Sequence, residues 1–130
     1  MISNFQFSKP SLLSIEYRAG VDCDSPKSFD IVNNFNVKIN RNESEPTAFV
    51  SLVFNISTEA ENLPFFINAE IGAYFKWDDT FSDDEISSLL NKNAPALLLS
   101  YLRPIVSNLT SAGNHAAYDI PFMNFTEGVE

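Results

Sequence analysis

Apolar side chains at every second position of two stretches constrain the fold more than any other feature of this sequence. In residues 65–77 every odd position is apolar: Phe65, Ile67, Ala69, Ile71, Ala73, Phe75 and Trp77. In residues 48–56 every even position is apolar: Ala48, Val50, Leu52, Phe54 and Ile56. A period of two over this length is typical of β-strands that bury one face. The residues between the two stretches are few and mostly polar, which predicts an antiparallel hairpin.

Two weaker alternating stretches upstream predict further strands. The first carries Leu13, Ile15 and Tyr17, and the second carries Phe29, Ile31, Phe35, Val37 and Ile39. Pro10 precedes the first of them, and a proline cannot donate a hydrogen bond to a β-ladder. We therefore expect an edge strand with an irregular start there, and four strands in the sheet.

A change of period after Trp77 predicts helices in the second half of the chain. Ser82 and Glu85 have the spacing of a capping box, which predicts a helix that begins near Phe81. Pro95 suits the first turn of a second helix.

The predicted second helix carries an apolar stripe and a proline. The stripe consists of Leu98, Tyr101, Leu102, Ile105 and Leu109. Pro104 lies inside the helix and predicts a kink, whereas Gly113 suits its C-terminal end. The tail that follows is expected to lie as an extended strap over the helix or the sheet.

These elements predict an α+β fold in a single domain of residues 1–130, with a four-stranded antiparallel sheet and two C-terminal helices on one face. The opposite face would present Phe49, Val53, Phe66 and Tyr74. That face is too apolar for water, so we expect a homo-oligomer in which a second copy covers it.

Charge excludes some classes of partner. The net charge is -9 with only eight Lys and Arg residues, whereas nucleic acids require clustered cations. No apolar run reaches the length of a membrane span, so we expect no membrane insertion. The first residues lack the pattern of a signal peptide, which predicts a cytoplasmic protein.

The chain also lacks the usual residue patterns of enzymes and metal sites. His115 and Cys23 are the only histidine and the only cysteine, and the four glycines form no phosphate-binding motif. The acidic run of residues 77–85 lacks the spacing of a calcium loop, and helix capping explains Asp83 to Glu85 within it without a bound ion. We expect no catalytic residue, no metal and no cofactor.

The second half resembles the SecB protein-export chaperones. The stretches "NAPALLLSYLRPIVSNLTSAG" and "YDIPFMNF" carry the resemblance, which continues more weakly through the strands. The residues that match the family motif are Asn93, Pro95, Tyr101, Arg103, Gly113, Pro121, Asn124 and Phe125.

The resemblance implies a dimer of dimers, hence a homotetramer, that holds unfolded polypeptides in apolar grooves without ATP and delivers some of them for export. By position, the client groove would contain Val37, Ile39, Phe75, Trp77 and Phe81. For each of these a core role is the alternative. The residues that match the motif are expected to be structural.

Two departures count against docking to the SecA motor. Where the family's first strand presents acidic residues, this chain has Ser14 and Arg18, and Glu16 between them is assigned to the other face. Family members that serve SecA also continue into a further helix and a tail beyond the position where this sequence ends. The resemblance therefore implies a trimmed chaperone core.

Three functions remain open from the sequence. The first is a general holdase for unfolded clients or preproteins. The second is a dedicated chaperone of one partner, such as the antitoxin of a toxin–antitoxin–chaperone system. The third is an α+β domain that binds a small apolar ligand in a Phe-lined interior.

Overall fold

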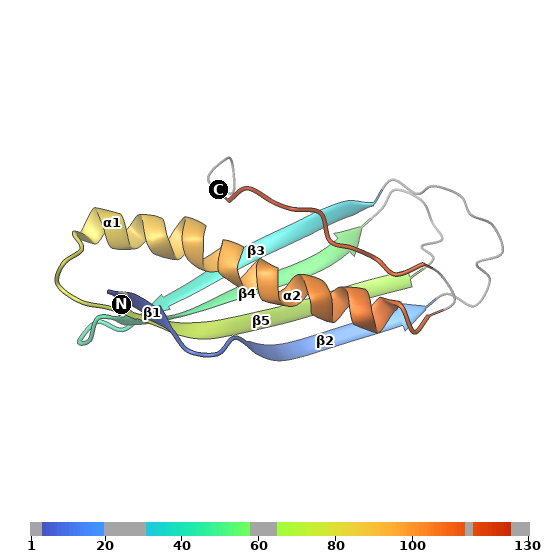
Figure 1. Cartoon of the computed structure of the whole chain (residues 1–130), viewed down its shortest axis with the longest axis horizontal. Helices are drawn as coiled ribbons and strands as arrows, with labels where there is room; N and C mark the ends of the chain where they lie inside the picture. Colours follow the sequence, from blue (N-terminus) through green and yellow to red (C-terminus); the bar gives the residue numbers. More distant parts are fainter. Residues whose placement is uncertain (1–3, 20–30, 58–64, 114–115, 126–130) are drawn as a thin grey trace.

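The computed structural model describes residues 4–19, 31–57, 65–113 and 116–125 (Figure 1). Its strands are β1 (Phe5–Phe7), β2 (Ser11–Ala19), β3 (Val32–Arg41), β4 (Thr47–Ser57) and β5 (Phe65–Trp77). Its helical segments are α1 (Asp83–Ser88), the π-helical turn η1 (Leu89–Asn93) and α2 (Ala94–Thr110). The strands pair antiparallel and the helical segments cross one face of the sheet, which confirms the predicted α+β class.

The sheet has five strands, so the prediction of four was wrong. The chain around Pro10 divides the first predicted strand into β1 and β2, which pair with opposite ends of β5 along the same edge. A register shift between Leu12 and Ser14 adds to the irregularity of this edge. From β5 the order continues to β4 and then to β3, and the predicted hairpin of β4 with β5 is confirmed.

One continuous helical run follows the sheet, so the prediction of two separate helices was also wrong. It begins at the predicted capping box, where Ser82 and Glu85 each accept a hydrogen bond from the backbone N–H of the other. The N–H of Ala94 donates to the carbonyl of Leu89, five residues back. A regular α-helix would press the ring of Pro95 against a carbonyl of the preceding turn, and the wider π turn provides room for it.

Helix α2 packs on the sheet with a face that is rotated relative to the predicted stripe. Its buried residues are Ala94, Pro95, Leu98, Leu99, Leu102, Val106 and Thr110. Leu98 and Leu102 are buried as predicted, whereas Tyr101 is 43% exposed and Val106 takes the inward position. Pro104 lies within α2, which is helical on both sides of it.

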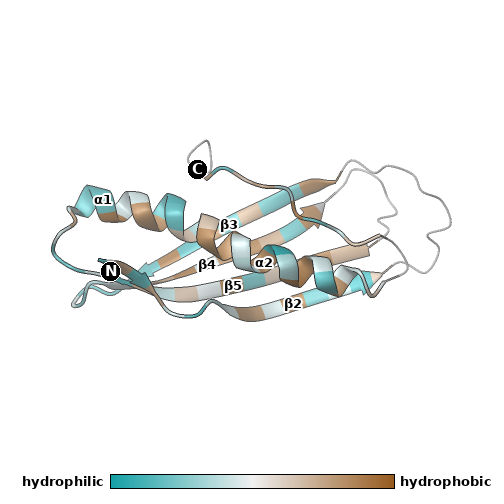
Figure 2. Ribbon diagram, in the orientation of Figure 1, coloured by the Kyte–Doolittle hydropathy of each residue, from teal (hydrophilic) through white to brown (hydrophobic). Residues whose placement is uncertain are grey.

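The inward face of the sheet forms the core together with the helix. The alternating residues of β4 and β5 that the sequence singled out are buried, apart from the half-buried Trp77. Figure 2 shows this alternation as brown and teal segments along the strands.

An extended strap, residues 116–125, runs back from the end of α2 toward β3 (Figure 1). Ile120 and Phe125 are buried, and the ring of Phe125 meets Phe35 of β3 edge-on at 6.0 Å. The strap thereby closes the core on the β3 side of α2.

The outer face of the sheet is the side turned away from the helix. The predicted residues Phe49, Val53, Phe66 and Tyr74 all lie on it. The ring of Phe49 lies so close to Gly72 that a Cβ atom there would come within 2.7 Å of the ring. The absence of a side chain at Gly72 therefore lets an aromatic ring rest on the backbone of β5.

Candidate functional site

An aromatic cluster, which we call the aromatic end, forms where β1 meets the last residues of β5. It consists of Phe5, Phe75, Trp77 and Phe81. The ring of Phe5 stacks on Phe75 at 5.5 Å and on Trp77 at 6.4 Å, and it meets Phe81 edge-on at 6.4 Å. The pairing of Phe5 with Trp77 places these rings on the face that carries the helix.

The rings of the aromatic end differ in exposure. Phe75 is only 1% exposed, so its ring forms a floor, whereas Phe5, Trp77 and Phe81 are half-buried and reach the surface. Phe7 tilts onto Phe75 from the sheet edge and is 44% exposed. This gradation from buried to exposed rings suits a surface that binds apolar groups.

Val37 and Ile39 lie apart from the aromatic end. Both are half-buried on the same face of the sheet, but they belong to β3, which forms the opposite edge from β1. Ile39 pairs with Val50 of β4, so two strands separate it from β1. The five predicted groove residues therefore form two groups rather than one.

Phe5 and Phe7 were missing from the predicted groove. Their spacing of two residues in "FQF" is a strand signal, but the stretch is short and Pro10 follows it. Only the pairing of β1 with the end of β5 shows that they join Phe75 and Trp77.

Charged side chains surround the aromatic end. The guanidinium of Arg41 lies 5.5 Å from the ring centre of Trp77 and forms an ion pair of 3.1 Å with Asp83. Asp78 and Glu85 are exposed nearby in sequence. Hydrogen bonds from the side chain and backbone of Thr80 lower the pKa of Asp78.

The capping box also lowers the pKa of a carboxyl group, at the start of the helix. Hydrogen bonds from the backbone N–H and then the hydroxyl of Ser82 lower the pKa of Glu85. Asp79, Asp83 and Asp84 add further exposed carboxylates between β5 and α1. The rim of the aromatic end is therefore acidic at neutral pH.

Residues of the motif hold the strap in place. The side chain of Arg103 donates from Nε to the carbonyl of Ile120 at 2.8 Å, and its guanidinium lies 5.8 Å from the ring centre of Phe122. Phe125 is buried against β3, and Pro95 is a buried residue in the first turn of α2. These contacts join α2 to the strap, and the structural role that the resemblance implies for the motif residues stays a prediction.

The other motif residues lie at the boundaries of elements. The N–H of Gly113 donates to the carbonyl of Thr110 at 3.1 Å, just beyond α2. Asn93 precedes α2 and is exposed. Pro121 and Asn124 are exposed residues of the strap.

The hydroxyl of Thr110 connects the helix to the strap. It donates to the carbonyl of Val106 and accepts from the N–H of Tyr118, both at 2.8 Å. The phenol of Tyr118 donates to the side chain of Asn33 on β3. Burial raises the pKa of Tyr118, and the hydrogen bond to Asn33 lowers it in part.

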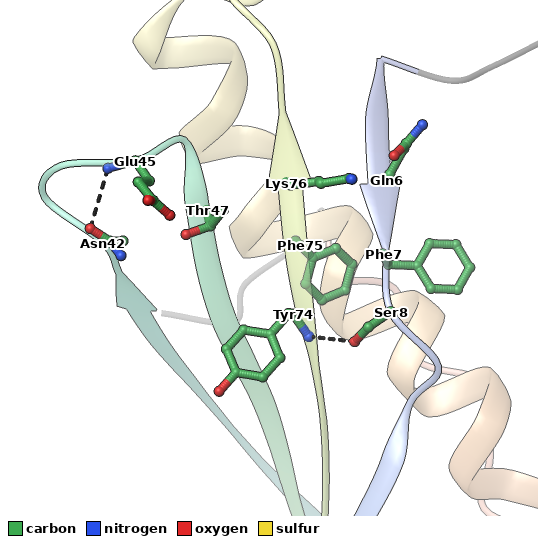
Figure 3. Close-up of a pocket in the computed structure, with 9 residues that line it drawn as sticks. All are labelled: Gln6, Phe7, Ser8, Asn42, Glu45, Thr47, Tyr74, Phe75 and Lys76. Carbon is green, nitrogen blue, oxygen red and sulfur yellow. Dashed lines mark hydrogen bonds between the residues drawn. The ribbon is translucent and has the colours of Figure 1, made fainter.

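The outer face holds the second group of surface features. Two hollows, of about 600 and about 360 Å³, adjoin each other around Tyr74, Asn42 and Thr47. Figure 3 shows the larger hollow, with Tyr74 beside it. The backbone N–H of Tyr74 donates a hydrogen bond to the hydroxyl of Ser8. The lining of both hollows mixes polar and aromatic side chains.

The three residues considered for SecA docking share the outer face, so the assignment of Glu16 to the other face was wrong. Ser14, Glu16 and Arg18 are two residues apart along β2, and a strand presents such residues on one side. Arg18 and Glu16 form an ion pair of 2.9 Å.

Comparison with known families explains the motif. The family described as "Preprotein translocase subunit SecB" matches residues 13–127. This chain belongs to the SecB family. Members of the family are holdase chaperones rather than enzymes, which confirms that prediction for this SecB-like chain.

Two solved structures resemble the SecB-like fold described here. A SecB-like chaperone from Mycobacterium tuberculosis, in complex with a ChAD peptide from the HigA1 antitoxin, matches with a TM-score of 0.75 and 13% identity. The match covers 92% of this chain and 91% of that one. A protein of unknown function from Streptococcus agalactiae matches with a TM-score of 0.52 and 17% identity, over 91% and 97% of the two chains. At these identities the likeness shows the fold, and no curated protein sequence matches the chain.

Within the described ranges, no three His, Cys, Asp or Glu side chains are grouped so that they could hold a metal ion. His115 and Cys23 lie outside those ranges. None of the helices in the described part of the chain is long and apolar enough to cross a bilayer.

Proposed function

We propose that this SecB-like chain is an ATP-independent holdase that binds extended apolar segments of unfolded polypeptides at its aromatic end. The observation that carries the proposal is the arrangement of rings there. Phe75 forms a buried floor, and Trp77 and Phe81 are half-buried above it. Apolar side chains of an extended segment would gain burial against such rings without requiring one defined sequence.

Val37 and Ile39 would provide a second, shallower contact on the β3 edge. Each contact alone would be weak, because each offers only part of its surface. A client that reaches both would bind more tightly through effective concentration, in this copy and in the copies of a homotetramer.

The acidic rim favours clients with Lys or Arg beside their apolar residues. Asp78 and Glu85 are negatively charged at neutral pH, and hydrogen bonds lower their pKa values further. Since these carboxylates are exposed, salt would weaken this contribution. A cytoplasmic chaperone that meets newly made chains is consistent with this chemistry.

A second candidate is a chaperone dedicated to one antitoxin. It is favoured by the structural match to a SecB-like chaperone that was solved with an antitoxin peptide. Delivery of preproteins to SecA has less support here, because Arg18 is paired with Glu16 where an acidic docking surface would be expected. A small-ligand domain also has less support, because the hollows around Tyr74 are lined by polar as well as aromatic groups.

Fluorescence of Trp77 offers a direct test, because this residue is the only tryptophan of the chain. Titration with an unfolded client that lacks tryptophan should shift the emission to shorter wavelength as the indole loses water. A second test measures how well each variant suppresses the aggregation of an unfolded client. The double variant Trp77→Ser with Phe81→Ser should abolish suppression. Tyr101→Ser should retain it and serves as a matched control at an exposed aromatic residue.

Binding affinities for different clients distinguish a general holdase from a dedicated chaperone. A general holdase should bind unrelated unfolded clients with similar affinity, whereas a dedicated chaperone should bind one antitoxin segment far more tightly. Equal suppression by the wild type and by the double variant would show that the aromatic end is not the client site.

A further inference from the structure

Arg41 lies between the two groups of proposed client contacts. It is the last residue of β3, and it shares a face of the sheet with Val37 and Ile39 because strand residues two apart point the same way. Its guanidinium reaches across the end of β4 and lies 5.5 Å from the ring centre of Trp77 on β5. A client segment that extends from Ile39 to Trp77 therefore has to pass Arg41.

Arg41 covers one side of the indole of Trp77. Phe5, from β1, stacks on the indole at 6.4 Å with 21° between the two rings. Since β1 and β3 lie at opposite edges of the sheet, Phe5 and Arg41 approach Trp77 from opposite sides. A cation over an indole is attracted by the electrons of the ring. One side of the indole therefore meets another ring, and the other side meets a positive charge.

Asp83 adds a carboxylate to this contact. Its Oδ1 lies 3.1 Å from Nη2 of Arg41. The contact is possible because the end of β3 and the start of α1 lie at the same end of the molecule (Figure 1). An aromatic ring beside a carboxylate suits any guanidinium or ammonium group. The same two groups would suit an Arg or Lys of a client whose apolar neighbours lie on the rings of the aromatic end.

The side chain of Arg41 can leave this position without a change in the backbone. It is 39% exposed, and that of Asp83 is 82% exposed, so water weakens their attraction. The backbone of Arg41 is held in the ladder with β4. In the turn that follows, Oδ1 of Asn42 accepts hydrogen bonds from the N–H groups of Ser44 and Glu45. Rotation of the side chain alone would therefore release Arg41 from the indole.

We propose that Trp77 and Asp83 form a cation subsite of the aromatic end, and that Arg41 fills this subsite until an Arg or Lys side chain of a client replaces it. This inference rests on the proposed binding of clients at the aromatic end. Arg41 acts as an internal competitor, which lowers the affinity for every client that needs the covered side of the indole. A neutral client that displaced it would leave Asp83 without a cation, so the exchange favours basic clients.

Two matched peptides test the subsite by titration against the whole chain, with the emission of Trp77 as the signal. Both consist of Leu and Ser residues, and one has a single central Arg where the other has Gln. Arg41→Gln removes the competitor and should raise the affinity for the Arg peptide roughly threefold to tenfold, with a smaller gain for the Gln peptide. Asp83→Asn in the Arg41→Gln background should bring the two affinities close together again.

Arg18→Gln is the matched control. The guanidinium of Arg18 also pairs with a carboxylate, Glu16 at 2.9 Å, and lies 5.2 Å from the ring centre of Phe66, but on the outer face. Its replacement changes the net charge by the same amount as Arg41→Gln, and both affinities should stay close to those of wild type. An unchanged affinity in Arg41→Gln would overturn the proposal. Equal gains for the two peptides, or the same gain in Arg18→Gln, would also overturn it.

Quenching of Trp77 by acrylamide, a neutral quencher, tests the contact of Arg41 without a client. Arg41→Gln should increase the quenching, because one side of the indole loses its cover, and Arg41→Lys should increase it less. Unchanged quenching in Arg41→Gln would show that Arg41 does not cover the indole and would overturn the proposal. Failure of the proposed function gives a different result: neither peptide would shift the emission of Trp77 in any variant, although acrylamide would still respond to Arg41→Gln. That result would overturn both proposals.

Discussion

The two faces of one sheet bury their aromatic residues in different ways. On the helix side, Phe54 and Phe75 are at most 1% exposed, because side chains packed on this side cover them. The ring of Phe35 lies against Phe54, and the ring of Phe5 stacks on Phe75. On the outer face, the ring of Phe49 lies against the backbone at Gly72 and Tyr74 projects into solvent. Aromatic side chains of one sheet thus differ in burial according to what lies above them. The comparison shows that the covering element, rather than the strand sequence, decides which face becomes core.

The helix side itself is closed at one end and open at the other. Under α2, buried leucines such as Leu98 and Leu102 meet the sheet. Near α1 the buried helical residues are Ile86 and Leu90, and Trp77 and Phe81 remain half-buried. The open end of an otherwise closed face is where we place client binding.

The largest contrast between the faces is expected from truncation under α2. Leu102→Ala removes a fully buried side chain and should lower the free energy of unfolding by about 2–5 kcal/mol. Val53→Ala, on the half-buried outer face, should cost about 1 kcal/mol or less. Urea unfolding followed by circular dichroism measures both. Equal losses would mean that the outer face is packed as closely as the core.

A methyl group at Gly72 tests the packing of Phe49 against the backbone on the outer face. Gly72→Ala places a Cβ atom about where Phe49 now lies, with contacts of 2.7 Å to the ring and 3.1 Å to the carbonyl of Val50. We expect a loss of about 1–3 kcal/mol in the free energy of unfolding. In the Phe49→Ala background the same change should cost less, with a coupling of about 1 kcal/mol. Additive losses would show that the ring does not rest on Gly72.

Much of this fold was predictable because local patterns determined it. The alternation in β4 and β5 indicated both strands and their inward faces, and Ser82 with Glu85 indicated the helix start. The division of the edge strand was less predictable, since Pro10 indicates an irregularity but not whether pairing resumes beyond it. The continuity of the helix depends on a π turn before Pro95, which no spacing rule indicates.

The candidate site was predictable only in part. Trp77 and Phe81 do lie together, but Phe5 joined them through strand pairing that the sequence does not specify. Alternation indicates the face on which a side chain lies but not the order of the strands. The sequence therefore did not show that two strands separate Val37 and Ile39 from β1. The contacts of Arg103 with the strap likewise depend on segments that are distant in sequence.

The smallest effect is expected from the phenol that links the strap to β3. Tyr118→Phe removes its hydrogen bond to Asn33 and should cost about 1 kcal/mol near neutral pH. Burial raises the pKa of Tyr118 above its ordinary value of 10.0, so folding favours the neutral phenol. Its contribution is therefore fully present below that ordinary value and is lost as the pH rises through the higher pKa of the folded state.

Unfolding measured as a function of alkaline pH separates this group from the others that titrate there. Wild type should lose more stability above pH 10.0 than Tyr118→Phe, whereas at neutral and mildly acidic pH the difference in stability between the two should stay constant. Parallel profiles for wild type and Tyr118→Phe would mean that the phenol does not help to hold the strap on the helix side. The strap would then depend on Arg103, on the backbone hydrogen bond of Tyr118 to Thr110 and on its buried apolar residues.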